Sequence, residues 1–205
     1  MDGVGVTFII STTTGLEELG RVVFGQLFSS VNSELVAQTS AWGARDSVFS
    51  SMLGVPYEPL LLEQFEPTNM FIGHIPTLID APVTNYPNLS VMAPDLSAAP
   101  TSMDQADEYM LNFYVEFMVK SDETVGSEAQ QRQVNMRVQR TAASIHNVLM
   151  QDRTLGGFVA DTIIARTINI TDVFIRREAK ARGPEWFWQA GRMDYTVRVP
   201  AVYSW

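Results

Sequence analysis

Residues 127–157 read SEAQQRQVNMRVQRTAASIHNVLMQDRTLGG, and this stretch decides the fold. Its apolar residues recur every three or four positions, which is the spacing of one stripe along an α-helix. They are Val134, Val138, Ala142, Ile145, Val148 and Leu149. Ser127 followed by Glu128 suits the start of this predicted helix, since a hydroxyl caps the first turn and an acid complements the helix dipole. Gly156 and Gly157 suit its end, because glycine adopts left-handed backbone angles at little cost.

The polar residues of this stretch fall largely off the apolar stripe. They are Gln131, Arg132, Asn135, Gln139, Arg140, Ser144, Asn147 and Gln151. The spacing predicts that they face solvent or a partner. Arg132, Gln139 and Arg140 are therefore candidates for an outer interaction face of the helix.

Strands flank the helix on both sides. Residues 108–120, EYMLNFYVEFMVK, alternate as a half-buried strand does. Residues 158–175 and 185–203 are rich in β-branched and aromatic residues and predict two further strands that form a hairpin beside the first, with Gly191 as a candidate bulge. The expected fold is α+β: a small antiparallel or mixed sheet packed with a long central helix and an N-terminal helix.

The N-terminal helix is predicted over residues 15–39, where leucine and valine recur every three or four positions after Thr14, a candidate N-cap. Residues 1–14 hold a short apolar run that suits a strand added to a sheet or a docked arm. Beyond residue 39 the periodicity is lost, and residues 40–100 contain eight of the ten prolines. We expect one domain over residues 1–205, with 40–100 an extended, proline-rich region or partner-binding insertion that includes short strands at 69–79 and 88–92.

Composition indicates a folded protein with an uneven charge. The chain is 46% hydrophobic and carries a formal net charge of -9. Residues 1–119 hold 2 basic and 14 acidic residues (net -12), and residues 120–205 hold 12 basic and 9 acidic residues (net +3). This split suits copies that meet head to tail; the alternative is that each part solvates its own surface. An acidic balance argues against a dedicated nucleic-acid binder.

Several classes of site have no support in the sequence. The chain has no cysteine, so disulfides and thiolate chemistry are excluded. Its apolar runs are too short for a membrane span, and no secretory signal is visible. It has no phosphate-binding glycine loop and no nucleophile elbow, and its two histidines, His74 and His146, lie far apart. We expect no enzyme activity, no cofactor and no metal.

One basic cluster remains as a candidate site. Residues 176–184, RREAKARGP, predict a polar loop whose basic residues are Arg176, Arg177, Lys180 and Arg182. These side chains are suited to DNA phosphates or to an acidic protein surface. The alternative is a solvated hairpin tip.

The order of these segments resembles the tail terminator (tail-completion or neck) proteins of long-tailed bacteriophages. The most specific part is residues 138–170, VQRTAASIHNVLMQDRTLGGFVADTIIARTINI, in which a helix, a Leu-Gly-Gly turn and a strand follow one another. The resemblance covers roughly residues 104–203. The first hundred residues match only in general order.

The resemblance implies a structural virion protein. Family members form a hexameric ring that ends the tail tube and joins the tail to the head-tail connector, with DNA passing through its channel. The implied partners are further copies of the chain, the tail tube protein and connector or neck proteins, and the implied location is the virion after assembly in the host cytoplasm. The alternatives are another neck protein, such as a stopper or a tube-associated protein, or a small cytoplasmic α+β binding module.

Overall fold

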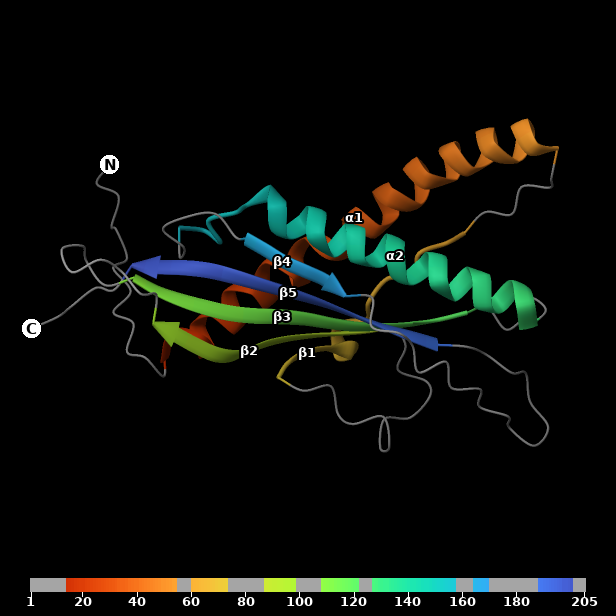
Figure 1. Ribbon diagram of the computed structural model, residues 1–205. Helices are drawn as coiled ribbons and strands as arrows, with labels where there is room; N and C mark the ends of the chain where they lie inside the picture. Colours follow the sequence, from red (N-terminus) through yellow and green to blue (C-terminus); the bar gives the residue numbers. More distant parts are fainter. Residues whose placement is uncertain are drawn as a thin grey trace, which may run out of the picture.

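The computed structural model in Figure 1 describes residues 14–54, 60–73, 87–98, 108–121, 127–157, 164–169 and 188–200. Its helices are α1 (Thr14–Leu53), a single 3₁₀ turn η1 (Pro67–Asn69) and α2 (Ser127–Gln151). Its strands are β1 (Met70–Ile72), β2 (Asn88–Ala98), β3 (Glu108–Lys120), β4 (Ile164–Asn169) and β5 (Trp188–Pro200). The predicted helix and strand at residues 127–151 and 108–120 are confirmed.

The strands form one mixed sheet in the order β1-β2-β3-β5-β4. Only the β1–β2 pair is parallel, and the other pairs are antiparallel. β5 lies between β3 and β4, so the predicted pairing of the last two strands beside residues 108–120 is confirmed. The fold is α+β, as expected.

Both helices contribute to the core on one face of the sheet (Figure 1). Alternate residues of the central strands point to this face, among them Phe113, Val115 and Phe117 of β3 and Tyr195 of β5. The predicted apolar stripe of α2 packs against them and is buried along its whole length. α1 adds a second stripe, formed by Leu19, Val23, Leu27, Val31 and Leu35. These packed stripes explain why the two helices form a layer on the sheet.

α1 is longer than the sequence predicts. It continues from residue 39 to Leu53 and ends at Gly54, whose φ of 66° suits glycine. The prediction that residues 40–53 belong to an extended region is wrong. The buried stripe of α1 ends at Leu35, so the later turns do not continue the apolar pattern that predicts the first part of the helix. In Figure 1 these turns run on past the sheet.

Residues 60–66 return along the helices as an extended segment. Asn32 of α1 pairs with the backbone of Phe65 as a neighbouring strand would: its Oδ1 accepts from the Phe65 N–H and its Nδ2 donates to the Phe65 carbonyl, both at 2.8 Å. The Thr39 hydroxyl accepts a bond from the Leu62 N–H at 3.2 Å. Leu60, Leu62 and Phe65 are buried. This part of the proline-rich region is therefore built into the fold.

The two short strands expected in the proline-rich region differ in length from the prediction. β1 covers only residues 70–72, and residues 74–79 lie outside the described part of the chain. β2 runs past residue 92 to Ala98 and includes Pro94. The register with β3 shifts between Met92 and Asp95, and β1 pairs only with residues 89–91. Pro94 is tolerated because it lies at an irregularity and beyond the reach of β1, where its missing N–H breaks no ladder bond.

Gly191 is not the predicted bulge. The β3–β5 register runs without a shift from Glu108 to Lys120, and Gly191 pairs directly with Phe117. A Cβ at position 191 would overlap the ring of Phe117, which is fully buried. The absent side chain thus makes room for a core aromatic ring.

Gly191→Ala is expected to lower the free energy of unfolding by about 2 kcal/mol, because the enclosed ring must shift to admit the methyl group. Urea titration measures this change. Gly25→Ala is the matched control, since a Cβ there meets nothing within 4 Å on exposed helix, and it should leave stability equal or raise it by up to about 1 kcal/mol. A Gly191→Ala protein as stable as wild type would contradict the account of this position.

Candidate functional site

The turn after α2 contains the DRTLGG sequence that carries the resemblance. The Asp152 carboxylate accepts bonds from the Thr154 N–H at 3.1 Å, the Thr154 hydroxyl at 2.7 Å and the Gly156 N–H at 2.7 Å. These bonds, led by that of the Thr154 hydroxyl and then that of the Gly156 N–H, hold the pKa of Asp152 below its usual value. Leu155 is buried although its φ is 51°, and Gly156 and Gly157 also have positive φ. The motif therefore forms a tight turn with one apolar anchor.

Gln26 of α1 contacts the C-terminal end of α2. Gln26 Nε2 donates to the Val148 carbonyl at 2.8 Å and lies 3.5 Å from the Asp152 carbonyl. Carbonyls in the last turn of a helix have no partner within the helix, so a side chain from a neighbouring element stabilises them. The two helices and the turn thus form one rigid corner.

His146 of α2 contacts the core at Tyr195. The imidazole Nδ1 lies 3.4 Å from the Tyr195 hydroxyl, and the two rings are stacked. Burial, and secondarily the Arg153 guanidinium, hold the pKa of His146 below its ordinary value of 6.5. Burial also raises the pKa of Tyr195, so its phenol stays protonated at physiological pH. The contact is a packed pair that joins α2 to β5.

His146 is expected to make stability fall in mild acid. Its folded-state pKa lies below its unfolded value, so the unfolded chain binds the proton more readily and stability is lost as the pH falls below about 6.5. Urea midpoints at about pH 7.5 and about pH 5.5 should differ more in wild type than in His146→Gln. Equal pH dependence in the two proteins would contradict this role.

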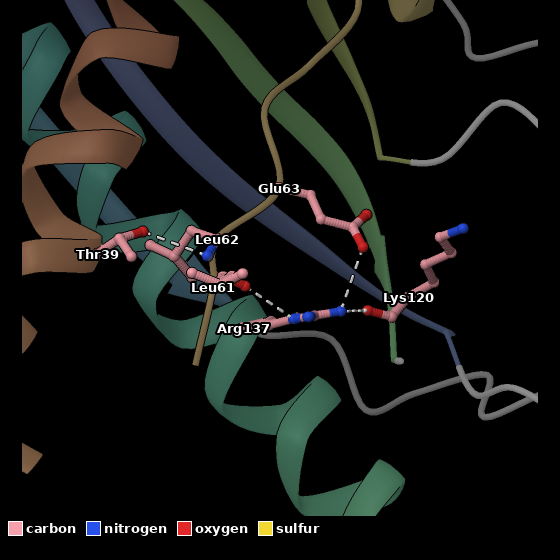
Figure 2. A network of polar contacts seen from close by, with 6 residues as sticks. All are labelled: Thr39, Leu61, Leu62, Glu63, Lys120 and Arg137. Atoms are coloured by element: carbon pink, nitrogen blue, oxygen red, sulfur yellow. Dashed lines mark hydrogen bonds and ion pairs between the residues drawn. The ribbon is translucent and has the colours of Figure 1, made fainter. Parts of the chain in front are cut away.

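A buried arginine makes polar contacts that join three parts of the chain (Figure 2). The Arg137 side chain of α2 is 3% exposed. Its Nε donates to the Leu61 carbonyl at 3.1 Å, and its Nη1 donates to the Lys120 carbonyl at 2.6 Å and lies 3.4 Å from Glu63 Oε1. The planar guanidinium thus joins α2 to the end of β3 and to the 60–66 segment.

The predicted outer face of α2 is only partly exposed. Arg132 and Gln139 are exposed, and their role as partner contacts stays a prediction. Placing Arg140 on this face is wrong: it is buried against α1, where its Nη2 lies 2.6 Å from Asp46 Oδ2 and its guanidinium lies 5.0 Å from the Trp42 ring centroid. Ser144 is buried too. Arg140 lies on the side of α2 that the unpredicted second half of α1 covers.

The basic cluster Arg176, Arg177, Lys180 and Arg182 lies outside the described residues. Its proposed contact with DNA or protein therefore stays a prediction. Among the residues that the structure does describe, no group of three or more acidic or histidine side chains is arranged to hold a metal ion. No helix in the described ranges is long and apolar enough to cross a membrane.

A large apolar surface at the end of α1 was not predicted from the sequence. Four large apolar side chains there are exposed: Val48 by 59%, Phe49 by 61%, Met52 by 76% and Leu53 by 72%. We call these four residues the α1 tip. They were missed because no helix is predicted beyond residue 39, although Val48 and Met52, like Phe49 and Leu53, have the four-residue spacing of one helix face. A contiguous apolar surface of this kind is typical of an interaction site.

The comparisons with known proteins concern the fold. No protein-family model matches the chain, and no curated protein matches its sequence. Among solved structures the chain is similar to a chain in the virion of a native gene transfer agent (GTA) particle, with 12% sequence identity and a TM-score of 0.40. The alignment covers 93% of this chain and 99% of that one. A likeness at this level carries no information about function, so the proposal below rests on the residues themselves.

Proposed function

We propose that this chain is a structural virion protein, the subunit of a ring that ends a phage tail tube and joins the tail to the head-tail connector. The observation that supports this best is the turn at residues 152–157. It lies within residues 138–170, the most specific part of the resemblance to tail terminators, and Asp152 and Leu155 hold it in a defined shape after α2.

The surfaces of the chain suit a ring subunit better than an enzyme. The α1 tip leaves apolar area uncovered, and β1 and β4 are the outer strands of an open sheet. Apolar surface and sheet edges are features that subunit contacts cover. The buried side chains of Arg137 and Arg140 and the half-buried side chain of Asn32 each join one element to another. In the proposed ring, genomic DNA passes through the channel without sequence-specific binding.

Light scattering tests the ring directly. The purified chain is expected to have six times the mass of one subunit over a range of concentrations. A single-chain mass at every concentration would show that the chain does not form a ring in solution before it binds a tail tube. Binding to head connectors together with no binding to tail tubes would favour a different neck protein.

A further inference from the structure

The outer side of the second half of α1 carries almost no charge. This half runs past the sheet (Figure 1), and residues 36–53 span about 27 Å along the helix axis. Asp46 is half-buried and paired with Arg140, so Arg45 is the one exposed charged side chain among residues 36–53. Helix surfaces that face solvent are normally rich in charged and polar side chains. A long face with one charge therefore indicates a surface that a partner covers.

Apolar side chains on this side form one stripe along the helix. They recur at spacings of four, three, four and four residues, which places them on one helix face. We call them the α1 outer stripe: Ala37, Ala41, Ala44, Val48 and Met52. All five are exposed, Val48 by 59% and Met52 by 76%. The side chains become larger toward the end of α1, so a partner that fits closely is bulky against the alanines and slim against Met52.

The surface around the stripe offers few hydrogen-bonding groups to a partner. The Ser33 and Ser40 hydroxyls beside it donate to the Ser30 and Val36 carbonyls of the same helix, at 2.8 and 3.3 Å. A strand or loop laid on this face would leave its own N–H and C=O groups without partners, which is costly. A helix satisfies its backbone internally, and alanines allow two helix axes to approach to about 8 Å. The partner that fits this face is therefore a helix.

Arg45 sets the charge of that helix. It follows Ala44 near the midpoint of the stripe, and its exposed guanidinium lies 5.0 Å from the Trp42 ring centroid. An acidic residue near the middle of the partner helix complements this cation.

A second copy of this chain does not fit the same stripe. Antiparallel pairing of two copies brings their Arg45 side chains next to each other, and like charges at such positions are destabilising. Parallel pairing sets Met52 against Met52 and alanine against alanine, so the large residues hold the small ones apart. Size and charge together thus favour a helix of a different sequence.

We infer that the α1 outer stripe docks an apolar helix of another protein, with an acidic residue of that helix placed against Arg45. The inference deepens the proposed function, because it names a surface and the kind of partner that covers it. It rests on the proposed function only for the partner being a tail tube or connector protein. Helix docking itself follows from the exposure, size and charge of the stripe and its flanks.

A peptide of residues 33–54 that carries Arg45→Glu is a suitable probe. Laid antiparallel on α1, it sets its own valine and methionine against Ala41 and Ala37 and places its carboxylate beside Arg45. The native peptide of the same length is the matched control. Fluorescence anisotropy of the dye-labelled peptides is expected to give a Kd about fivefold lower for the charge-reversed peptide than for the native one. In the Arg45→Glu chain the preference should reverse, and salt should reduce it in both chains.

Ala44→Gln in the chain tests the position of the contact. It puts a longer side chain at the centre of the stripe and keeps a good helix former, so both peptides should bind about tenfold more weakly. Ser29→Gln is the control, because Ser29 is exposed on the same helix before the stripe begins, and it should bind as wild type does. Circular dichroism and the urea midpoint should match wild type in both variants, since both positions are exposed.

Three results overturn the inference. They are the absence of binding by either peptide at the highest soluble concentration, binding of the native peptide as tight as that of the charge-reversed one, and unchanged binding in Ala44→Gln. None of them decides the tail-terminating function, which is tested separately by binding to tail tubes. If the charge-reversed peptide binds as expected and the chain binds neither tubes nor connectors, the inference holds and the proposed function fails.

Discussion

Arg137→Ala is expected to lower the free energy of unfolding by about 3 kcal/mol. The side chain is almost fully buried, and it donates to the Leu61 and Lys120 carbonyls and pairs with Glu63. Removing it leaves two carbonyl oxygens without this donor in a site that alanine does not fill. It also releases the 60–66 segment from α2. Urea titration followed by circular dichroism measures the loss.

Two further variants show whether the lost hydrogen bonds or the lost packing of the side chain lowers the stability of Arg137→Ala. Arg137→Met keeps most of the apolar stem but no donor, and it should lose nearly as much stability as alanine if the hydrogen bonds dominate. Arg132→Ala removes an exposed arginine from the same helix and should change stability by no more than about 0.5 kcal/mol. Equal small losses in Arg137→Ala and Arg132→Ala would show that the buried network does not hold the fold together.

Asn32→Ala is expected to lower the free energy of unfolding by about 2 kcal/mol, because both backbone groups of Phe65 lose their partner. Asn147→Ala is the control, since its bond to Glu34 lies at the exposed surface, and it should cost less than about 1 kcal/mol. Hydrogen exchange at the Phe65 amide should rise in Asn32→Ala and not in Asn147→Ala. An unchanged Phe65 amide would contradict the role of Asn32.

Periodicity predicted the elements that bury one apolar face. The stripe of α2 and the alternation in β3 identify these elements because the sheet and the helix cover each other along their whole length. Composition predicted the last two strands as a hairpin beside β3, and the structure shows that β5 is the one next to it. The second half of α1 was not predicted, because it runs past the sheet and does not continue the buried stripe of the first half.

The errors at the candidate site have a related cause. α2 is covered on two sides, by the sheet and by α1, so its buried arc is wider than its apolar stripe. Arg137, Thr141 and Ser144 are buried and recur at three- or four-residue spacing beside the stripe. Of these, Arg137 contacts the 60–66 segment and the end of β3, so the polar stripe does not mark the contact with α1 alone. Arg140 is buried because it contacts Asp46 and Trp42 of α1, and the sequence did not predict a helix at those two residues. The side chains that bind residues 60–66 are isolated polar residues on the two helices, and isolated residues give no periodic pattern in the sequence.

Electron microscopy of purified tail tubes from the same virion, mixed with an excess of the wild-type chain, tests the proposed tail-terminating ring. A ring of sixfold symmetry is expected at one end of each tube, with an open channel in line with that of the tube. Bare tube ends, or protein bound only along the sides of the tubes, would contradict it.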